Sequence, residues 1–147
     1  MGCFGGRLGA RQAAQHRQLK RFKGLFAGSC NLRRKLHDQF AIARDLTDDG
    51  LVLRYRNTEG LNADGLTGEE GTFVICSFWL VSCLALAGEV DRAEELFDRL
   101  AGYANDLGLL GEEIDTAAGE QLGNFPQAFS HIGLITAAWQ IDQARAR

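Results

Sequence analysis

The sequence has few of the features that mark a membrane or secreted protein. No uninterrupted apolar run reaches the roughly 18 to 20 residues that a helix needs to cross a bilayer. The longest candidate, residues 73–87, is interrupted by Ser77 and Ser82. The first residues lack the apolar core and cleavage site of a secretory signal, and Gly6 stands where a myristoylation signal has Ser or Thr. We therefore expect a cytoplasmic chain with no membrane partner.

The four cysteines follow no pattern typical of metal binding. Cys3, Cys30, Cys76 and Cys83 include no CxxC pair, and none is closely paired with a histidine, so the spacing does not predict zinc. Cys76 and Cys83 fall two turns apart on one predicted helix, which is too far for a disulfide. We expect these two to be small core residues in a reducing compartment, and we expect no cofactor.

Acidic residues are absent from the first quarter of the chain. Residues 1–36 carry nine Lys or Arg and no acid, whereas all 19 Asp and Glu lie from Asp38 onward. Such a basic arm is one signature of nucleic-acid binding. However, no folded RNA-binding motif accompanies it, and it has too few apolar side chains to offset the entropy of ordering. We expect residues 1–30 to be a basic, disordered leader without a nucleic-acid partner.

The rest of the chain, residues 31–147, has the pattern of a single helical domain. The predicted elements are a helix over 31–46, a strand-like segment over 51–56, a loop to residue 71, a buried helix over 73–87, a half-exposed helix over 90–104, a loop over 105–125 and a largely buried helix opened by Pro126. Buried and amphipathic helices alternate, which is typical of paired inner and outer helices in an all-α toroid. No internal repeat supports a solenoid instead.

An acidic loop is the first candidate for chemistry. Glu112, Glu113 and Asp115 fall within four positions, just ahead of a buried helix. Adjacent carboxylates repel each other's charge, and one of them can then serve as a general acid or base. Acidic pairs in loops are also ordinary solvated surface. The residues alone leave both interpretations open.

Two stretches resemble a known family. They are EGTFVICSFWLVSCLALAGEVDRAEELFDRL and NDLGLLGEEIDTAAGEQLGNFPQAFSHIGLITAA. Both are similar to the C-terminal part of glycoside hydrolase family 15 catalytic domains, which include glucoamylases, glucodextranases and bacterial trehalases. The resemblance runs from about Leu46 to Ala138, and GNFPQAFSH after a GLL-x-EE-x-D loop is its most specific part.

The resemblance implies an (α/α)6 barrel, or six-hairpin toroid, that hydrolyses α-glucosidic bonds with inversion, in trehalose or malto-oligosaccharides. It assigns the general base to the Glu that follows GLL-x, which is Glu112. An inverting enzyme uses this carboxylate to activate water while a second one protonates the leaving oxygen. Glu113 and Asp115 would tune the charge of Glu112, or bind a sugar hydroxyl in the case of Glu113.

The resemblance also implies residues that contact the sugar. Arg54 and Tyr55 match an Arg-Tyr pair of the substrate pocket, although an exposed arginine on a short strand is the alternative. Glu70 and Phe73 match the EG-x-F entry to an inner helix. Phe129 and His131 would support the site from the final helix, and Trp79 is expected in the core. These assignments predict an α-glucoside as the substrate.

A complete active site is not found in the sequence. The family's general acid follows a tryptophan far upstream, and no Trp precedes Trp79. We therefore expect a truncated part of the barrel. One explanation for the leader is that residues 1–30 are translated from a shifted reading frame. Its exposed helix faces would bind the missing N-terminal part of the barrel or a second copy. The alternatives are one half of a two-chain glucosidase and a noncatalytic sugar-binding or helical interaction module.

Overall fold

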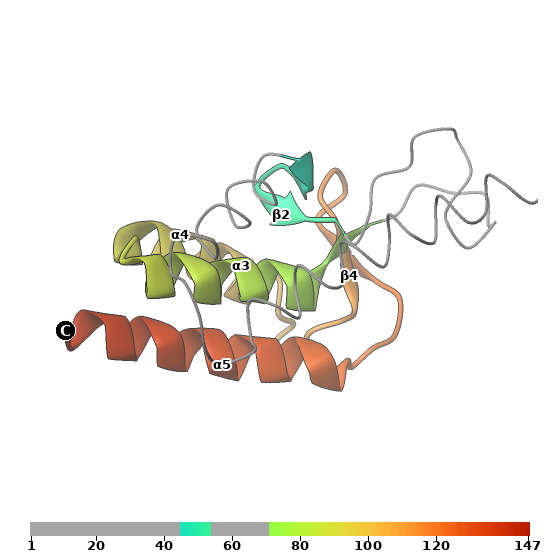
Figure 1. Ribbon diagram of the computed structural model, residues 1–147. Coiled ribbons are helices and arrows are strands. Elements are labelled where there is room, and N and C mark those ends of the chain that lie inside the picture. The colour runs from blue at the N-terminus through green and yellow to red at the C-terminus, as the bar shows by residue number, and fades with distance from the viewer. Residues whose placement is uncertain (1–44, 54–70) are drawn as a thin grey trace, which may run out of the picture.

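The computed structural model describes residues 45–53 and 71–147. The leader, most of the predicted helix 31–46, and Arg54, Tyr55 and Glu70 lie outside the described residues. The elements are β1 (Thr47–Asp48), β2 (Leu51–Val52), β3 (Thr72–Phe73), α3 (Val74–Ala87), α4 (Val90–Ala101), β4 (Glu113–Asp115), β5 (Glu120–Leu122) and α5 (Ala128–Arg145). Figure 1 shows α3 lying between α5 and the β1–β2 hairpin.

Helix α3 is the centre of the described fold. Its side chains are apolar on nearly every face, and ten of its residues are buried, including Cys76 and Cys83, as the sequence predicted. Gly88 ends the helix with a φ of 85°, a left-handed conformation that glycine adopts without a steric penalty. Its N–H bonds to Ala85, and the next N–H, that of Glu89, bonds to Leu84. The predicted helix 73–87 is therefore confirmed to within one residue.

Helix α4 follows directly and is amphipathic, as predicted. Ala93 and Leu100 are fully buried, whereas the opposite face carries exposed charged residues. Phe97 packs against Phe78 of α3 with ring centroids 5.9 Å apart. The helix ends at Ala101, three residues before the predicted end.

Helix α5 packs most extensively on α3, but only along one face. Its buried residues are Ser130, Gly133, Ala137 and Ile141, which recur every three to four positions. A Cβ atom on Gly133 would lie 3.1 Å from Cβ of Phe78, so this glycine permits the close approach. The opposite face is open: Phe129, Ile132, Ile135 and Trp139 are 62%, 56%, 65% and 57% exposed. The prediction that this helix is largely buried is therefore wrong.

Two small antiparallel sheets accompany the helices, and the all-α prediction is corrected accordingly. Strand β1 pairs with β2, which confirms the first residues of the strand-like segment, and β3, β4 and β5 form a three-stranded sheet. The sheet crosses the region predicted as the loop 105–125. Periodicity could not reveal it, because β4 and β5 have three residues each and β4 pairs with β3, about 40 positions earlier.

The β1–β2 hairpin is fastened to two helices. Ser77 of α3 accepts a hydrogen bond from the Val52 N–H at 2.9 Å, and Arg99 of α4 donates to the Asp49 carbonyl at 2.6 Å and to its carboxylate. Desolvation opposes the charge on Arg99, but its bonds to Asp49 and Tyr103 outweigh that effect and raise its pKa. The described part is thus three packed helices with two sheets at one end. None of the described helices is long and apolar enough to span a membrane.

Candidate active site

The segment that carries Glu112 is fixed through its backbone. The buried hydroxyl of Ser130 donates to the Gly111 carbonyl at 2.7 Å, and the Gly111 N–H donates to the side chain of Gln121. The Val74 N–H, at the start of α3, donates to the Glu112 carbonyl at 3.0 Å. Because these partners come from α3, β5 and α5, the position of Glu112 depends on the packing of all three elements.

His131 holds the residue just before this segment. Its Nε2 accepts a hydrogen bond from the Leu110 N–H at 3.3 Å, and its Nδ1 lies 2.8 Å from the Gln127 carbonyl. A backbone N–H can only donate and a carbonyl can only accept, so both contacts require the neutral ring with its proton on Nδ1. His131 therefore supports the loop through its backbone, and it does not line the pocket described next.

The Glu112 carboxylate is held at one oxygen by Asn124. Oε2 accepts from the Asn124 side-chain amide at 2.7 Å and from the Asn124 backbone N–H at 3.2 Å. Gly123 precedes Asn124 with a φ of 73°, and a Cβ there would lie 3.0 Å from Oε2 and 3.1 Å from Cβ of Glu112. The hairpin therefore approaches Glu112 as closely as it does because this position is glycine.

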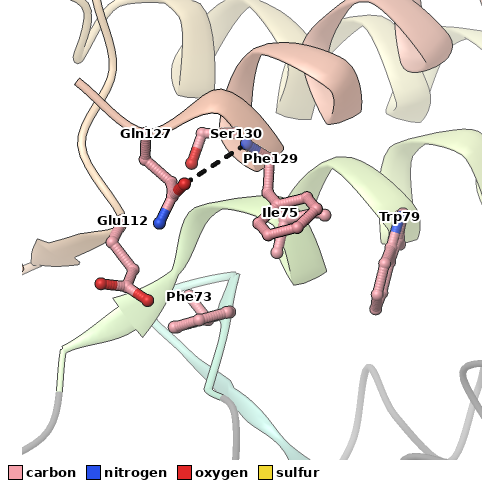
Figure 2. Close-up of a pocket in the computed structure, with 7 residues that line it drawn as sticks. All are labelled: Phe73, Ile75, Trp79, Glu112, Gln127, Phe129 and Ser130. Carbon is pink, nitrogen blue, oxygen red and sulfur yellow. Dashed lines mark hydrogen bonds between the residues drawn. The ribbon is translucent and has the colours of Figure 1, made fainter. Parts of the chain in front are cut away.

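A pocket of about 260 Å³ opens beside Glu112. It is lined by Phe73, Ile75, Trp79, Glu112, Gln127, Phe129 and Ser130. Figure 2 shows Glu112 and Phe73 at one end, Trp79 at the other, and Phe129 projecting from α5 between them. The Gln127 side chain accepts from the Phe129 N–H at 3.5 Å and begins α5. The described lining is mainly apolar and aromatic, and Glu112 is the one ionisable group among these seven residues.

The other predicted site residues fall in two groups, those that line the pocket and those that lie outside it. Phe73 and Phe129 line the pocket with Glu112. Glu113 is half-buried on β4, with its carboxylate beside Gly71. Asp115 accepts hydrogen bonds from the N–H groups of Ala117 and Ala118 at 2.9 and 3.1 Å, so its carboxylate caps the hairpin turn. The structure thus brings Glu112 together with the aromatic residues rather than with its acidic neighbours.

Sequence reasoning missed several residues of this site. Ile75, Gln127 and Ser130 line the pocket, and Asn124 and Gln121 bind the Glu112 segment. Four of these five lie in or beside the string GNFPQAFSH, which was recognised as a unit without roles for its polar members. Trp79 packs against the core, as predicted, but it also lines the pocket.

Among residues 45–53 and 71–147, no group of three or more His, Cys, Asp or Glu side chains is placed to hold a metal ion. The chemistry that the described residues offer is therefore that of one oriented carboxylate beside a pocket with aromatic walls. Aromatic walls suit the apolar faces of a sugar ring, and a carboxylate can accept a proton from water.

Comparison with known proteins identifies the family. The chain belongs to the glycosyl hydrolases family 15, whose profile matches residues 7–139. The match begins inside the basic leader. It includes every residue that lines the pocket.

Curated relatives of the chain carry the name trehalase. It is 57% identical to a trehalase of Mycolicibacterium smegmatis and 58% identical to one of Mycobacterium tuberculosis, over 104 residues in each case. A trehalase of Thermoplasma volcanium is 42% identical over 104 residues. These matches cover 70–71% of this chain but 15–16% of the relatives, so the chain spans about a sixth of their length. No solved structure matches the chain significantly.

Proposed function

We propose that this chain supplies the general-base part of an inverting α-glucoside hydrolase, with Glu112 as the base. The observation that carries the proposal is the Glu112 carboxylate at the end of an aromatic pocket, on a backbone held by three separate elements. In such a reaction the base takes a proton from water as the water attacks the anomeric carbon. A fixed position matters, because a misplacement of about 1 Å can lower the rate by about 10²-fold.

Several residues are proposed to bind the sugar around this base. Phe73 and Phe129 would contact the faces of the glucosyl ring, since both line the pocket next to Glu112. The roles of Arg54, Tyr55 and Glu70 stay predictions from the family resemblance. So do hydroxyl binding by Glu113 and charge tuning by Asp115. A hexose has apolar faces and a rim of hydroxyls, which this combination of aromatic, guanidinium and carboxylate groups would match.

The second half of the reaction is proposed to come from outside this chain. Glu112 is the one carboxylate among the described residues that line the pocket, whereas inversion needs a second one roughly 6.5 to 9.5 Å away. We propose that the described helices form part of an (α/α)6 barrel, whose other part provides this acid and packs on the open face of α5. The relatives' name makes trehalose the first candidate substrate, and malto-oligosaccharides the next.

The test is reconstitution with the remainder of the M. smegmatis trehalase, that is, the relative without its matching segment. The remainder is either co-expressed with this chain or joined to it as a chimaera. We expect trehalose hydrolysis with this chain present and none from either part alone, because activating water without protonating the leaving oxygen stabilises half of the transition state. Glu112→Gln should abolish hydrolysis, whereas Glu120→Gln, at an exposed carboxylate on β5, should leave it unchanged. Inactivity of both the pair and the chimaera would contradict the proposal.

A noncatalytic sugar-binding module is the second candidate, favoured by the single carboxylate among the described residues of the pocket. Thermal unfolding of the chain with and without trehalose separates the two, since a ligand bound by the folded state alone raises the unfolding temperature. A rise in that temperature, combined with inactive reconstitution, would support the binding module. The cytoplasmic location stays a prediction for either candidate.

A further inference from the structure

Asn124 makes an unusual contact for a residue in a surface hairpin. Its two amide groups, the side-chain amide at 2.7 Å and the backbone amide at 3.2 Å, both donate to Oε2 of Glu112. Hydrogen bonds to an ionised carboxylate are about twice as strong as neutral ones. Two of them from one residue fix both the position of the carboxylate and its rotation about the last side-chain bond.

The backbone around Asn124 is shaped for this contact. Gly123 has a positive φ, and no side chain fits between it and Glu112, since a Cβ would lie 3.0 Å from Oε2. Asn124 itself is exposed and follows β5 directly after Gly123. The short strand β5 is paired along its whole length with β4, which begins one residue after Glu112. The two partners therefore flank adjacent strands of one hairpin, with Glu112 just before β4 and Asn124 two residues after β5.

The two oxygens of Glu112 are consequently not equivalent. Oε2 already accepts two hydrogen bonds, whereas Oε1 accepts none from the part of the chain that the structure describes. A general base must present a lone pair within about 2.6 to 3.2 Å of the proton that it accepts. We propose that Asn124 is a positioning residue, which occupies Oε2 and leaves Oε1 to take the proton from the attacking water. This inference rests on the proposed function, because it assigns the oxygen that performs its chemistry.

The contact itself is tested in the full chain by NMR at neutral pH. In Glu112→Gln a charged acceptor becomes neutral, so the backbone and side-chain amide protons of Asn124 should both move upfield. Glu120→Gln, on the neighbouring strand, should leave both resonances in place. Unchanged Asn124 resonances in Glu112→Gln would overturn the proposal.

The role is tested in the reconstituted hydrolase. Asn124→Ala should lower kcat by about 10²-fold, the effect of a misplaced catalytic group, while KM changes by less than about threefold. The control is Asn105→Ala. Asn105 also holds a loop, because its side chain accepts from the N–H groups of Leu107 and Leu109, but it does not line the pocket. Its replacement should lower the unfolding temperature and leave kcat unchanged.

The outcomes separate the two proposals. If Asn124→Ala lowers stability as Asn105→Ala does and keeps kcat, the asparagine only closes the hairpin and the positioning role is wrong. If the unsubstituted pair and chimaera both fail to hydrolyse trehalose, the proposed function fails and this role fails with it. The NMR result still shows in that case whether Asn124 holds the carboxylate.

Discussion

Two glycines are neighbours of Glu112. One precedes it in the sequence, and the other packs against its side chain. Gly111 precedes it, and a Cβ there would come within 3.2 Å of the Gln121 side chain and 3.3 Å of the Leu122 carbonyl. Gly123 lies opposite, against the Glu112 side chain itself. The carboxylate is thus placed by backbone packing on two sides. Substitutions at these glycines should move Glu112 before they disturb the helices.

Gly123→Ala tests this packing. The substitution introduces a Cβ at 3.0 Å from Oε2 of Glu112 and at a φ of 73°, so we expect a loss of about 1 to 3 kcal/mol in the free energy of unfolding. Gly119→Ala is the matched control in the same hairpin, since its φ is 72° and nothing lies within 4 Å of its Cβ position. Denaturant unfolding measures both variants. Equal losses would mean that the contact with Glu112 adds nothing to the backbone strain.

At the scale of the elements, side-chain hydrogen bonds hold the β1–β2 hairpin on α3 and β3 on β4. Ser77 receives the Val52 N–H from β2 and donates to the Phe73 carbonyl at 3.1 Å. The Thr72 hydroxyl donates to the Ile114 carbonyl at 3.0 Å, next to the start of α3. The Val52–Ser77 and Thr72–Ile114 bonds join buried residues, so they satisfy polar atoms that water cannot reach.

Ser77→Ala should weaken the attachment of the β1–β2 hairpin to α3. It leaves the buried Val52 N–H without the Ser77 hydroxyl, and an unsatisfied buried donor costs about 1 to 3 kcal/mol. Ser82→Ala is the control, because the Ser82 hydroxyl is equally buried but donates to the Phe78 carbonyl within the same helix. Without this hydroxyl, the Phe78 carbonyl still accepts its backbone hydrogen bond in the helix. The free energies of unfolding of the two variants are compared. A larger loss for Ser82→Ala would contradict this account of the hairpin.

The elements also show what the sequence could predict. The ends of α3 and the two-sided character of α4 follow from local signals, namely apolar residues at helical spacing and Gly88 as a terminator. Strand β4 pairs with β3, about 40 positions earlier, and the three-residue strand β5 pairs with β4, so no local periodicity predicts this sheet. Glu112 could be singled out because the family resemblance marks it. The bonds that hold it, from Asn124, Gln121, Ser130 and His131, depend on the tertiary fold.

At the scale of the whole molecule, one side of the described structure is left open. Figure 1 shows α3 on one side of α5 and no described element on the other. The four exposed apolar residues of α5 lie on that open side, and Phe129, the first of them, also lines the pocket. Exposed large apolar residues that gather on one helix face are typical of an interface rather than of a free surface. Whatever covers α5 would therefore also border the proposed active site.

The open face predicts self-association of the chain when it is alone. We expect the average mass measured by sedimentation to rise with concentration, because burial of apolar surface favours contact between copies. Ile135→Lys should reduce this rise, since Ile135 is 65% exposed at the middle of the face. Leu107→Lys, at a 75% exposed leucine in the loop that follows α4, is the control and should not reduce it. A chain that stays monomeric at all concentrations would contradict the prediction.

The stereochemistry of reconstituted trehalose hydrolysis tests the central claim most directly. A general base that activates water inverts one glucosyl centre, so the first products should be α- and β-glucose in equal amounts, as followed by proton NMR before mutarotation. The reconstituted pair in which this chain carries Glu112→Gln should form neither α-glucose nor β-glucose. If α-glucose alone forms first, the centre is retained, Glu112 does not act as a base on water, and the account of this site is wrong.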